Sequence, residues 1–212
     1  MTNHMQQIKA KDFHFSKYVS KKRWISFFHQ IDEISSMDPE SILEIGVGSG
    51  VTGIVFKNIF NKIYESMDID CDLNPDHIGS VIEMPFTDNQ FDVVGCFQVL
   101  EHLPYDDFKK SLTEIFRVAK KGVIISLPNS RKTLRQFFSR LFSKNIGKYL
   151  SRKIKQYKHG DQHYWEINSK GHSLKNITKI ITNISGNFDF KLVKNYRVWE
   201  NPFHHFFILK KQ

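Results

Sequence analysis

The sequence predicts an α/β fold: a doubly wound, mostly parallel sheet with helices on both faces and an antiparallel hairpin at its C-terminal end. Two observations lead to this prediction. Short apolar segments of strand length alternate with segments whose apolar residues recur at helical spacing, which is typical of a parallel sheet covered on both faces. A glycine-rich loop, Gly46–Gly50, separates the first strand from the helix that follows it.

Length and composition indicate one globular domain. The chain has 212 residues, 40% hydrophobic and 25% charged, which excludes disorder and fibrous repeats. No apolar run approaches the roughly 18 residues of a membrane span, and residues 1–13 lack a signal-peptide core, so we expect a soluble, cytoplasmic protein. Cys71 and Cys96 lie near neither a second thiol nor a histidine pair at metal-ligand spacing. We therefore expect reduced thiols and no structural metal.

Positive charge is concentrated in one segment. The net charge is +9, from 31 Lys and Arg against 22 Asp and Glu. Residues 131–158 hold ten basic residues and no acid, which leaves −1 for the rest of the chain when these ten are subtracted. The question of an anionic partner therefore concerns this segment alone.

The first elements form a strand–loop–helix unit. Residues 17–35 are predicted to form an amphipathic helix, whose apolar residues fall at helical spacing: Trp24, Phe27, Phe28, Ile31 and Ile34. Pro39 ends this leader. Residues 41–45 then form a short apolar strand, and residues 51–60 a helix after the glycine loop.

Two further strands are predicted at 62–69 and 77–82. Only about seven residues separate them, whereas a parallel crossover normally takes ten to twelve or more. The connecting helix must therefore be missing or reduced to a turn, or one of these strands is wrong.

The remaining elements complete the sheet. Strands are predicted at 91–97 and 122–127, with a helix between them whose apolar face is Phe108, Leu112, Ile115, Phe116 and Ala119. The basic segment follows and has its own helical apolar spacing. Another helix, marked by Leu174, Ile177, Ile181 and Ile184, precedes two closing strands at 188–198 and 203–209.

The domain organisation follows from these elements. We expect a single domain over 1–212, made of four consecutive parts: a helical leader at 1–38, a core at 40–130, a basic amphipathic insertion or lid at 131–165, and a C-terminal helix and hairpin at 166–212.

The loop after the first strand is suited to a nucleoside-containing cofactor. Its three glycines lack Cβ atoms, so a ligand can approach the backbone closely. Asp68 ends the second strand, where a carboxylate can accept both hydroxyls of a ribose. Gly48–Gly53 matches G-x-G-x-x-G, which favours a dinucleotide, but Glu44 places a carboxylate where a diphosphate would lie. A cationic ligand, S-adenosylmethionine, suits Glu44 better. The alternative is a structural glycine turn without a ligand.

Four motifs occur in order: E-I-G-V-G-S-G at 44–50, M-P-F-T-D-N-Q-F-D-V-V at 84–94, V-L-E-H-L-P at 99–104 and R-V-A-K-K-G-V-I-I-S-L-P-N at 117–129. Together they resemble the class I, S-adenosylmethionine-dependent methyltransferases of the type 11 group, over about residues 40–130. The resemblance implies a seven-stranded Rossmann-like sheet.

The resemblance also implies roles for particular residues. The cofactor loop would consist of Glu44, Gly46, Val47, Gly48 and Gly50. The nucleoside would contact Asp68 through its ribose and Ile69, Ser80 and Val81 through its adenine, and the methionine end would be flanked by Phe97 and Gln98. Two departures bear on cofactor affinity: Ser80 stands where the family often has Asp, and the helix between the second and third strands is curtailed.

The acceptor side is less specific. His102 is the nearest candidate for a general base, with a structural or pocket-shaping role as the alternative. His163, Tyr164 and Trp165 belong to a polar and aromatic cluster that either lines the acceptor site or packs under a lid. His204 and His205 lie in a predicted strand and are taken as structural.

The basic segment 131–158 has three interpretations. It is a lid over the cofactor cleft, an anchor on an anionic membrane surface that suits a lipid-linked acceptor, or a nucleic-acid contact. Nucleic acid is disfavoured because no recognised nucleic-acid module is present. We expect methyl transfer to a small-molecule or carrier-linked (sugar or lipid-like) acceptor. The alternatives are a nicotinamide-dependent oxidoreductase and a non-catalytic membrane-surface or adaptor protein that keeps the fold.

Overall fold

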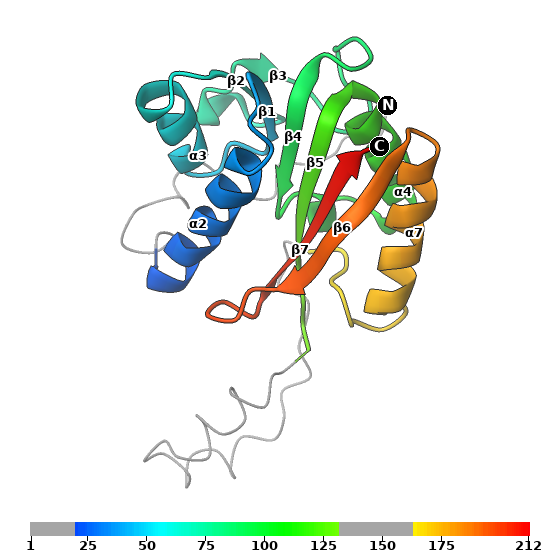
Figure 1. Ribbon diagram of the computed structural model, residues 1–212. Coiled ribbons are helices and arrows are strands. Elements are labelled where there is room, and N and C mark those ends of the chain that lie inside the picture. Colours follow the sequence, from blue (N-terminus) through cyan, green and yellow to red (C-terminus); the bar gives the residue numbers. More distant parts are fainter. Residues whose placement is uncertain (1–19, 132–162) are drawn as a thin grey trace, which may run out of the picture.

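The computed structural model describes residues 20–131 and 163–212 (Figure 1). They form a seven-stranded sheet in the order β3-β2-β1-β4-β5-β7-β6. The strands are β1 Ser41–Ile45, β2 Ile63–Asp68, β3 His77–Ile78, β4 Phe91–Phe97, β5 Ala119–Pro128, β6 Phe190–Arg197 and β7 His204–Lys211. β1 to β5 pair in parallel, and β7 is antiparallel to both β5 and β6. The predicted mostly parallel sheet with a C-terminal antiparallel hairpin is confirmed.

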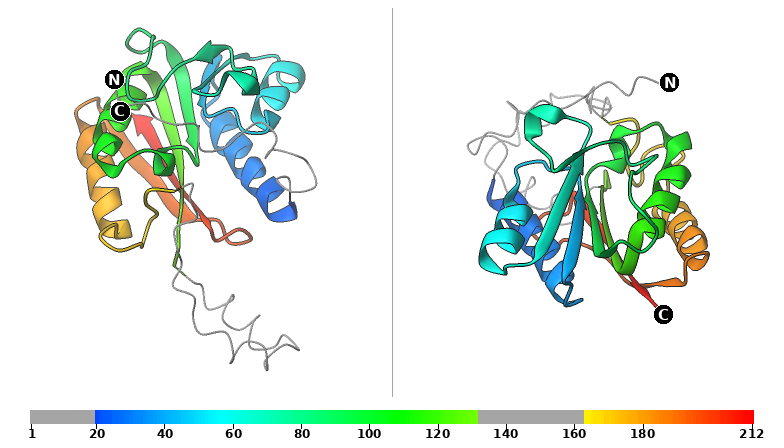
Figure 2. Two further views of the ribbon diagram at one scale, coloured as in Figure 1. Left: turned by 180° about the vertical axis from the view of Figure 1, so that it is seen from behind. Right: turned by 90° about the horizontal axis from the view of Figure 1, so that it is seen from above.

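Helices cover both faces of this sheet. They are α2 Lys21–Ser35, α3 Val51–Ile54, which continues into the π-helical turn η2 Val55–Ile59, α4 Phe108–Val118 and α7 Leu174–Gly186. Seen from above, α2 and α3 lie on one side of the sheet and α4 and α7 on the other (Figure 2). Each layer encloses its own group of buried apolar side chains. The side with α2 and α3 is the one on which the glycine loop opens.

The third strand is much shorter than predicted. β3 has two residues, His77 and Ile78, rather than the six of 77–82. The Gly79 N–H donates to the carbonyl of Asp68 at 3.0 Å and so completes the pairing of Asp68 with Ile78, after which the chain turns and the Glu83 N–H donates to the Ser80 carbonyl at 3.1 Å. The link from β2 to β3 is a single 3-10 turn, η3 Cys71–Leu73, so the expected connecting helix is reduced to a turn.

The leader helix begins later than predicted and buries only part of its predicted apolar face. Ser20 has an extended backbone and caps α2, so the helix starts at Lys21 rather than at residue 17. Phe27 and Ile34 are buried as predicted, whereas Trp24 and Phe28 are 55% and 62% exposed. The buried face also carries polar side chains with partners late in the chain. Lys194 Nζ and Tyr196 Oη donate to Glu33, and Asn201 Nδ2 donates to Ser26 Oγ.

Among the described residues, none of the helices has both the length and the apolar character needed to cross a bilayer. The basic segment 131–158 lies outside the described residues apart from Arg131, so its predicted helix and its lid or anchor role stay predictions.

Candidate functional site

The glycine loop lies where the strand order reverses, between β1 and β4. Doubly wound sheets bind ligands at this place. Three glycines of the loop have left-handed backbones: φ is +86° at Gly46, +54° at Gly48 and +71° at Gly50. A Cβ at Gly46 would also overlap Cγ2 of Val99, which follows β4. The loop backbone and its contact with the turn after β4 therefore both depend on glycine.

An open cavity of about 370 Å³ lies beside this loop. Residues from α2, the glycine loop and α3, the end of β4 and the start of β7 line it: Arg23, Phe27, Gln30, Glu44, Gly46, Val47, Gly48, Ser49, Val51, Thr52, Phe97, Gln98 and His204. Six of the residues that the sequence singled out, Glu44, Gly46, Val47, Gly48, Phe97 and Gln98, thus meet in one cavity.

Glu44 is a buried carboxyl at the cavity wall. It lies on β1, is 4% exposed and accepts a hydrogen bond from the Tyr64 hydroxyl. Burial raises the pKa of Glu44 to about 7, against the lowering effect of hydrogen bonds from Tyr64 and Thr52. Glu44 can therefore change its charge near neutral pH.

Asp68, at the end of β2, holds the glycine loop in place. Its Oδ2 accepts from the Val47 N–H and its Oδ1 from the Asp70 N–H, both at 2.9 Å. Burial raises the pKa of Asp68, and these two hydrogen bonds oppose the shift. Each carboxylate oxygen has a second lone pair, so Asp68 can also accept from a ligand. It touches the cavity through Val47 rather than lining it directly.

Ser49 is an unsatisfied polar group in the loop. Its hydroxyl oxygen is buried, lines the cavity and has no hydrogen-bond partner among the described residues. Buried polar groups of this kind are normally hydrogen-bonded, so a ligand with polar groups is the natural partner for Ser49.

The three residues assigned to the adenine lie outside the cavity. Ile69 is 47% exposed beside Asp68, Ser80 is half-buried, and Val81 is 5% exposed within the apolar core. The burial of Val81 favours packing over ligand contact. The cavity thus collects residues assigned to the glycine loop and to the methionine end, whereas the three residues assigned to the adenine do not line it.

Sequence reasoning missed several cavity residues: Arg23, Gln30, Thr52 and His204. Gln30 lies on the buried side of α2 and accepts a hydrogen bond from the Thr52 hydroxyl at 3.3 Å. A polar residue on the buried face of a helix is a sign of a nearby polar site. Gln30 was missed because the predicted apolar face of α2 was centred on Trp24 and Phe28 instead. His204 was taken as structural because it lies in a strand. Burial lowers its pKa to about 3, so it is neutral beside the cavity.

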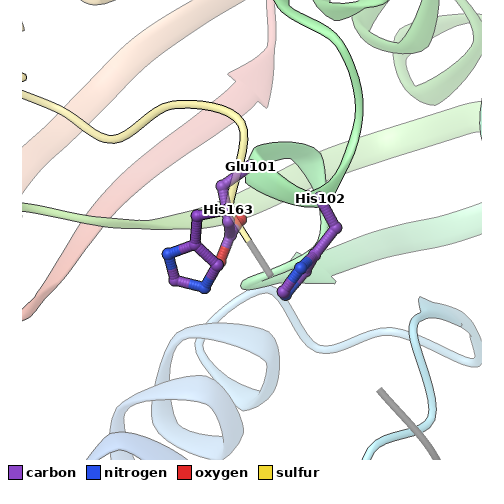
Figure 3. A group of neighbouring side chains, drawn as sticks. All are labelled: Glu101, His102 and His163. Carbon is purple, nitrogen blue, oxygen red and sulfur yellow. The ribbon is translucent and has the colours of Figure 1, made fainter. Parts of the chain in front are cut away.

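A second polar cluster adjoins the turn after β4 (Figure 3). Glu101 and His102 lie on the 3-10 turn η4 Leu100–His102, and the His163 ring centroid is 4.8 Å from that of His102. Burial raises the pKa of Glu101 to about 8. The structure thus brings together two residues that the sequence analysis assigned to separate roles, His102 and His163.

The two residues after His163 do not join this cluster and differ from each other in burial. Tyr164 is 55% exposed, and Trp165 is completely buried against Tyr105 and Phe108. The burial of Trp165 favours a packing role over contact with an acceptor. His205 is also buried and contacts Asn129 and Asn195 through its ring nitrogens, in line with a structural role.

Comparison with known proteins finds a matching family model and relatives of partial length. Residues 43–127 match the sequence model of a family described as "Methyltransferase domain". An uncharacterized protein of Methanocaldococcus jannaschii is 35% identical over 101 residues, 44% of this chain and 42% of that protein. A demethylmenaquinone methyltransferase of Listeria monocytogenes is 28% identical over 124 residues, 54% of this chain and 51% of that enzyme. The chain thus spans about half of the length of these relatives.

Solved structures share the fold at low sequence identity. The magnesium protoporphyrin IX methyltransferase of Synechocystis, solved with bound SAH (S-adenosylhomocysteine), aligns with a TM-score of 0.60 at 12% identity. The alignment covers 98% of this chain and 90% of that one. At this identity the likeness concerns the fold alone.

Proposed function

We propose that this chain, whose residues 43–127 match the model of a methyltransferase domain, is a class I enzyme that transfers a methyl group from S-adenosylmethionine to a small-molecule or carrier-linked acceptor. The observation that supports the proposal most is the cavity between the glycine loop and the end of β4. There, a buried carboxyl, an unsatisfied hydroxyl and a left-handed glycine backbone meet.

The polar groups of this cavity fit the charges of S-adenosylmethionine. In the proposed arrangement, Glu44 receives the ammonium group. Ser49 and the loop N–H groups receive the carboxylate, and Asp68 accepts from the ribose hydroxyls. Glu44 disfavours a diphosphate at the same place, which argues against the nicotinamide alternative. Ile69 and Ser80 then border the adenine.

The cofactor supplies a methyl group on a positively charged sulfur. The chain's own contribution is to hold the acceptor in line with that methyl and to keep water away. Phe97 is 8% exposed at the cavity wall, where it excludes water, and Gln98 is held by a hydrogen bond from its N–H to the Ser126 carbonyl at 3.0 Å. His102 either takes a proton from a hydroxyl acceptor or shapes the pocket.

The acceptor is proposed to be a small molecule or a carrier-linked sugar or lipid-like group. The names of two similar proteins point this way: the demethylmenaquinone methyltransferase and the magnesium protoporphyrin IX methyltransferase.

Calorimetric titration of the full chain tests the proposed cofactor. We expect micromolar binding of S-adenosylmethionine and S-adenosylhomocysteine, about 8 kcal/mol, and no heat from NAD in either redox form. Binding of NAD but not of S-adenosylmethionine would favour the oxidoreductase. Absence of binding to all of them would favour the non-catalytic adaptor.

The charge of Glu44 predicts how this affinity depends on pH. The carboxylate attracts an ammonium group only when ionised, and its pKa is about 7. Affinity for S-adenosylmethionine should therefore rise about tenfold from pH 6 to pH 8, as the ionised fraction rises. Glu44→Gln should bind weakly and show no such rise. Wild-type affinity that stays level or falls over this range would contradict the contact.

A further inference from the structure

The turn η4 and the segment that begins at His163 bring three potential metal ligands together. A carboxylate oxygen of Glu101 and one ring nitrogen each of His102 and His163 all lie within 4.8 Å of one another. The Tyr164 N–H donates to the Glu101 carbonyl at 2.9 Å, which ties the two segments together. In Figure 3 the three side chains converge from two parts of the chain. Ligands of one ion lie at most about 4 Å apart, so shifts of ~1 Å would bring these atoms to bonding distance.

The carboxylate of Glu101 is an independent sign of a missing partner. Glu101 is 0% exposed, and neither of its carboxylate oxygens has a hydrogen-bond partner among the described residues. Burying a carboxylate is costly unless it is paired or binds a cation. A bound ion would satisfy both oxygens.

His163 has a carboxylate partner of the kind that metal-binding histidines have. Its Nδ1 lies 2.8 Å from Oε1 of Glu166, which is 3% exposed in its side chain. A metal-binding histidine typically donates its other ring N–H to a carboxylate in this way, which fixes the ring orientation. Nε2 of His163 is then the atom available to an ion.

We propose that Glu101, His102 and His163 bind a first-row divalent transition metal ion, and that its open coordination positions take a hydroxyl oxygen of the acceptor. Two imidazoles and one carboxylate favour zinc, iron, cobalt or manganese over calcium and magnesium. Three protein ligands leave room for a further ligand, as in catalytic rather than structural sites. The proposed site uses neither cysteine, so it differs from the cysteine-bound structural metal whose absence the sequence predicts.

The position of the cluster connects it to the methyl-donor site, and this second part of the inference rests on the proposed function. Gln98, three residues before Glu101, lines the cavity, and Val99 packs against Gly46 of the glycine loop. A hydroxyl oxygen held by the ion would lose its proton to water more readily. Its lone pair would form the new C–O bond while the C–S bond breaks and leaves its electrons on sulfur.

Equilibrium dialysis of the full chain, stripped with a chelator and without cofactor, tests the site. We expect one Zn²⁺ or Co²⁺ per chain with micromolar or tighter affinity and a far weaker response to Mg²⁺. Glu101→Gln should weaken binding at least 100-fold, and Glu166→Gln, which loses only the second sphere, about 10- to 100-fold. The matched control is His77→Asn. It removes a histidine on β3 that also pairs with a carboxylate, that of Glu65. The metal affinity of this variant should equal that of the wild type.

Either of two results would overturn the site. One is that the wild type binds no ion more tightly than millimolar, and the other is that Glu101→Gln and the wild type bind the ion with the same affinity. Thermal unfolding shows whether Glu101→Gln folds, and His102→Gln, at a half-buried position, provides a second variant. The visible spectrum of the Co²⁺-loaded wild type gives a readout without mutation, since a mixed histidine and carboxylate shell should produce d–d bands that the free ion lacks.

The acceptor role is tested with 4-nitrocatechol, a chromogenic hydroxyl compound. Its visible spectrum should shift with the metal-loaded chain and stay unchanged with the stripped chain. An unchanged spectrum with the loaded chain would overturn the contact with acceptor oxygen. Because dialysis is done without cofactor and the calorimetric titration without metal, failure of the metal site and failure of the proposed methyl donor are observed separately.

Discussion

Asp68→Ala is expected to lower the affinity for S-adenosylmethionine by about 100-fold or more. A hydrogen bond to a charged group contributes about 1.5–3 kcal/mol, and loss of two such bonds to the ribose hydroxyls exceeds the 2.8 kcal/mol that corresponds to about 100-fold. The substitution also releases the Val47 and Asp70 N–H groups, which Asp68 holds at 2.9 Å. Calorimetric titration measures the affinity, and thermal unfolding measures the stability.

Asp68→Asn is the matched control. Its amide oxygen can still accept from the Val47 N–H, so the loop should keep its shape, whereas the negative charge and the acceptor for the Asp70 N–H are gone. We expect this variant to be somewhat less stable than the wild type and to bind with intermediate affinity. Wild-type affinity in Asp68→Ala would show that the ribose lies elsewhere.

Gly46→Ala is expected to abolish cofactor binding within the measurable range. The backbone at Gly46 has φ +86°, and an added Cβ would overlap Val99. A left-handed conformation costs a non-glycine residue about 1–2 kcal/mol and overpacking about 1–3 kcal/mol, so the loop loses about 2–5 kcal/mol unless it moves. Whether the loop is destabilised in place or moves, the shape of the cavity changes. Titration with S-adenosylmethionine and unfolding in denaturant measure the two effects.

Gly50→Ala separates the two causes. Gly50 has a similar backbone, φ +71°, but a Cβ there would meet nothing within 4 Å. Only the conformational cost of about 1–2 kcal/mol should remain. Equal effects of the two alanine variants would mean that the contact between Gly46 and Val99 does not matter.

Local sequence patterns were enough for most of the backbone. Strands 41–45 and 91–97 were predicted with the bounds that the structure has, since each is a compact apolar run with polar or turn residues at its ends. The glycine loop was found for a similar reason, because left-handed positions demand glycine wherever they occur. The length of β3 was not predicted, because it depends on where the chain turns away from β2, and that turn follows directly at residues 80–83.

Tertiary structure decided which side chains share a site. Arg23, Gln30 and His204 join the glycine loop only because α2 and β7 pack beside it, and no local pattern links positions so far apart. The same holds for His163, which lies near Glu101 because the N–H of its neighbour Tyr164 donates to the Glu101 carbonyl, across more than sixty residues. The sequence by itself determined the class of fold and the glycine loop, because these depend on residues close along the chain, and its ordered motifs led to the proposed methyl donor. The full lining of the cavity and the candidate metal site depend on how distant segments pack, and this only the tertiary structure decided.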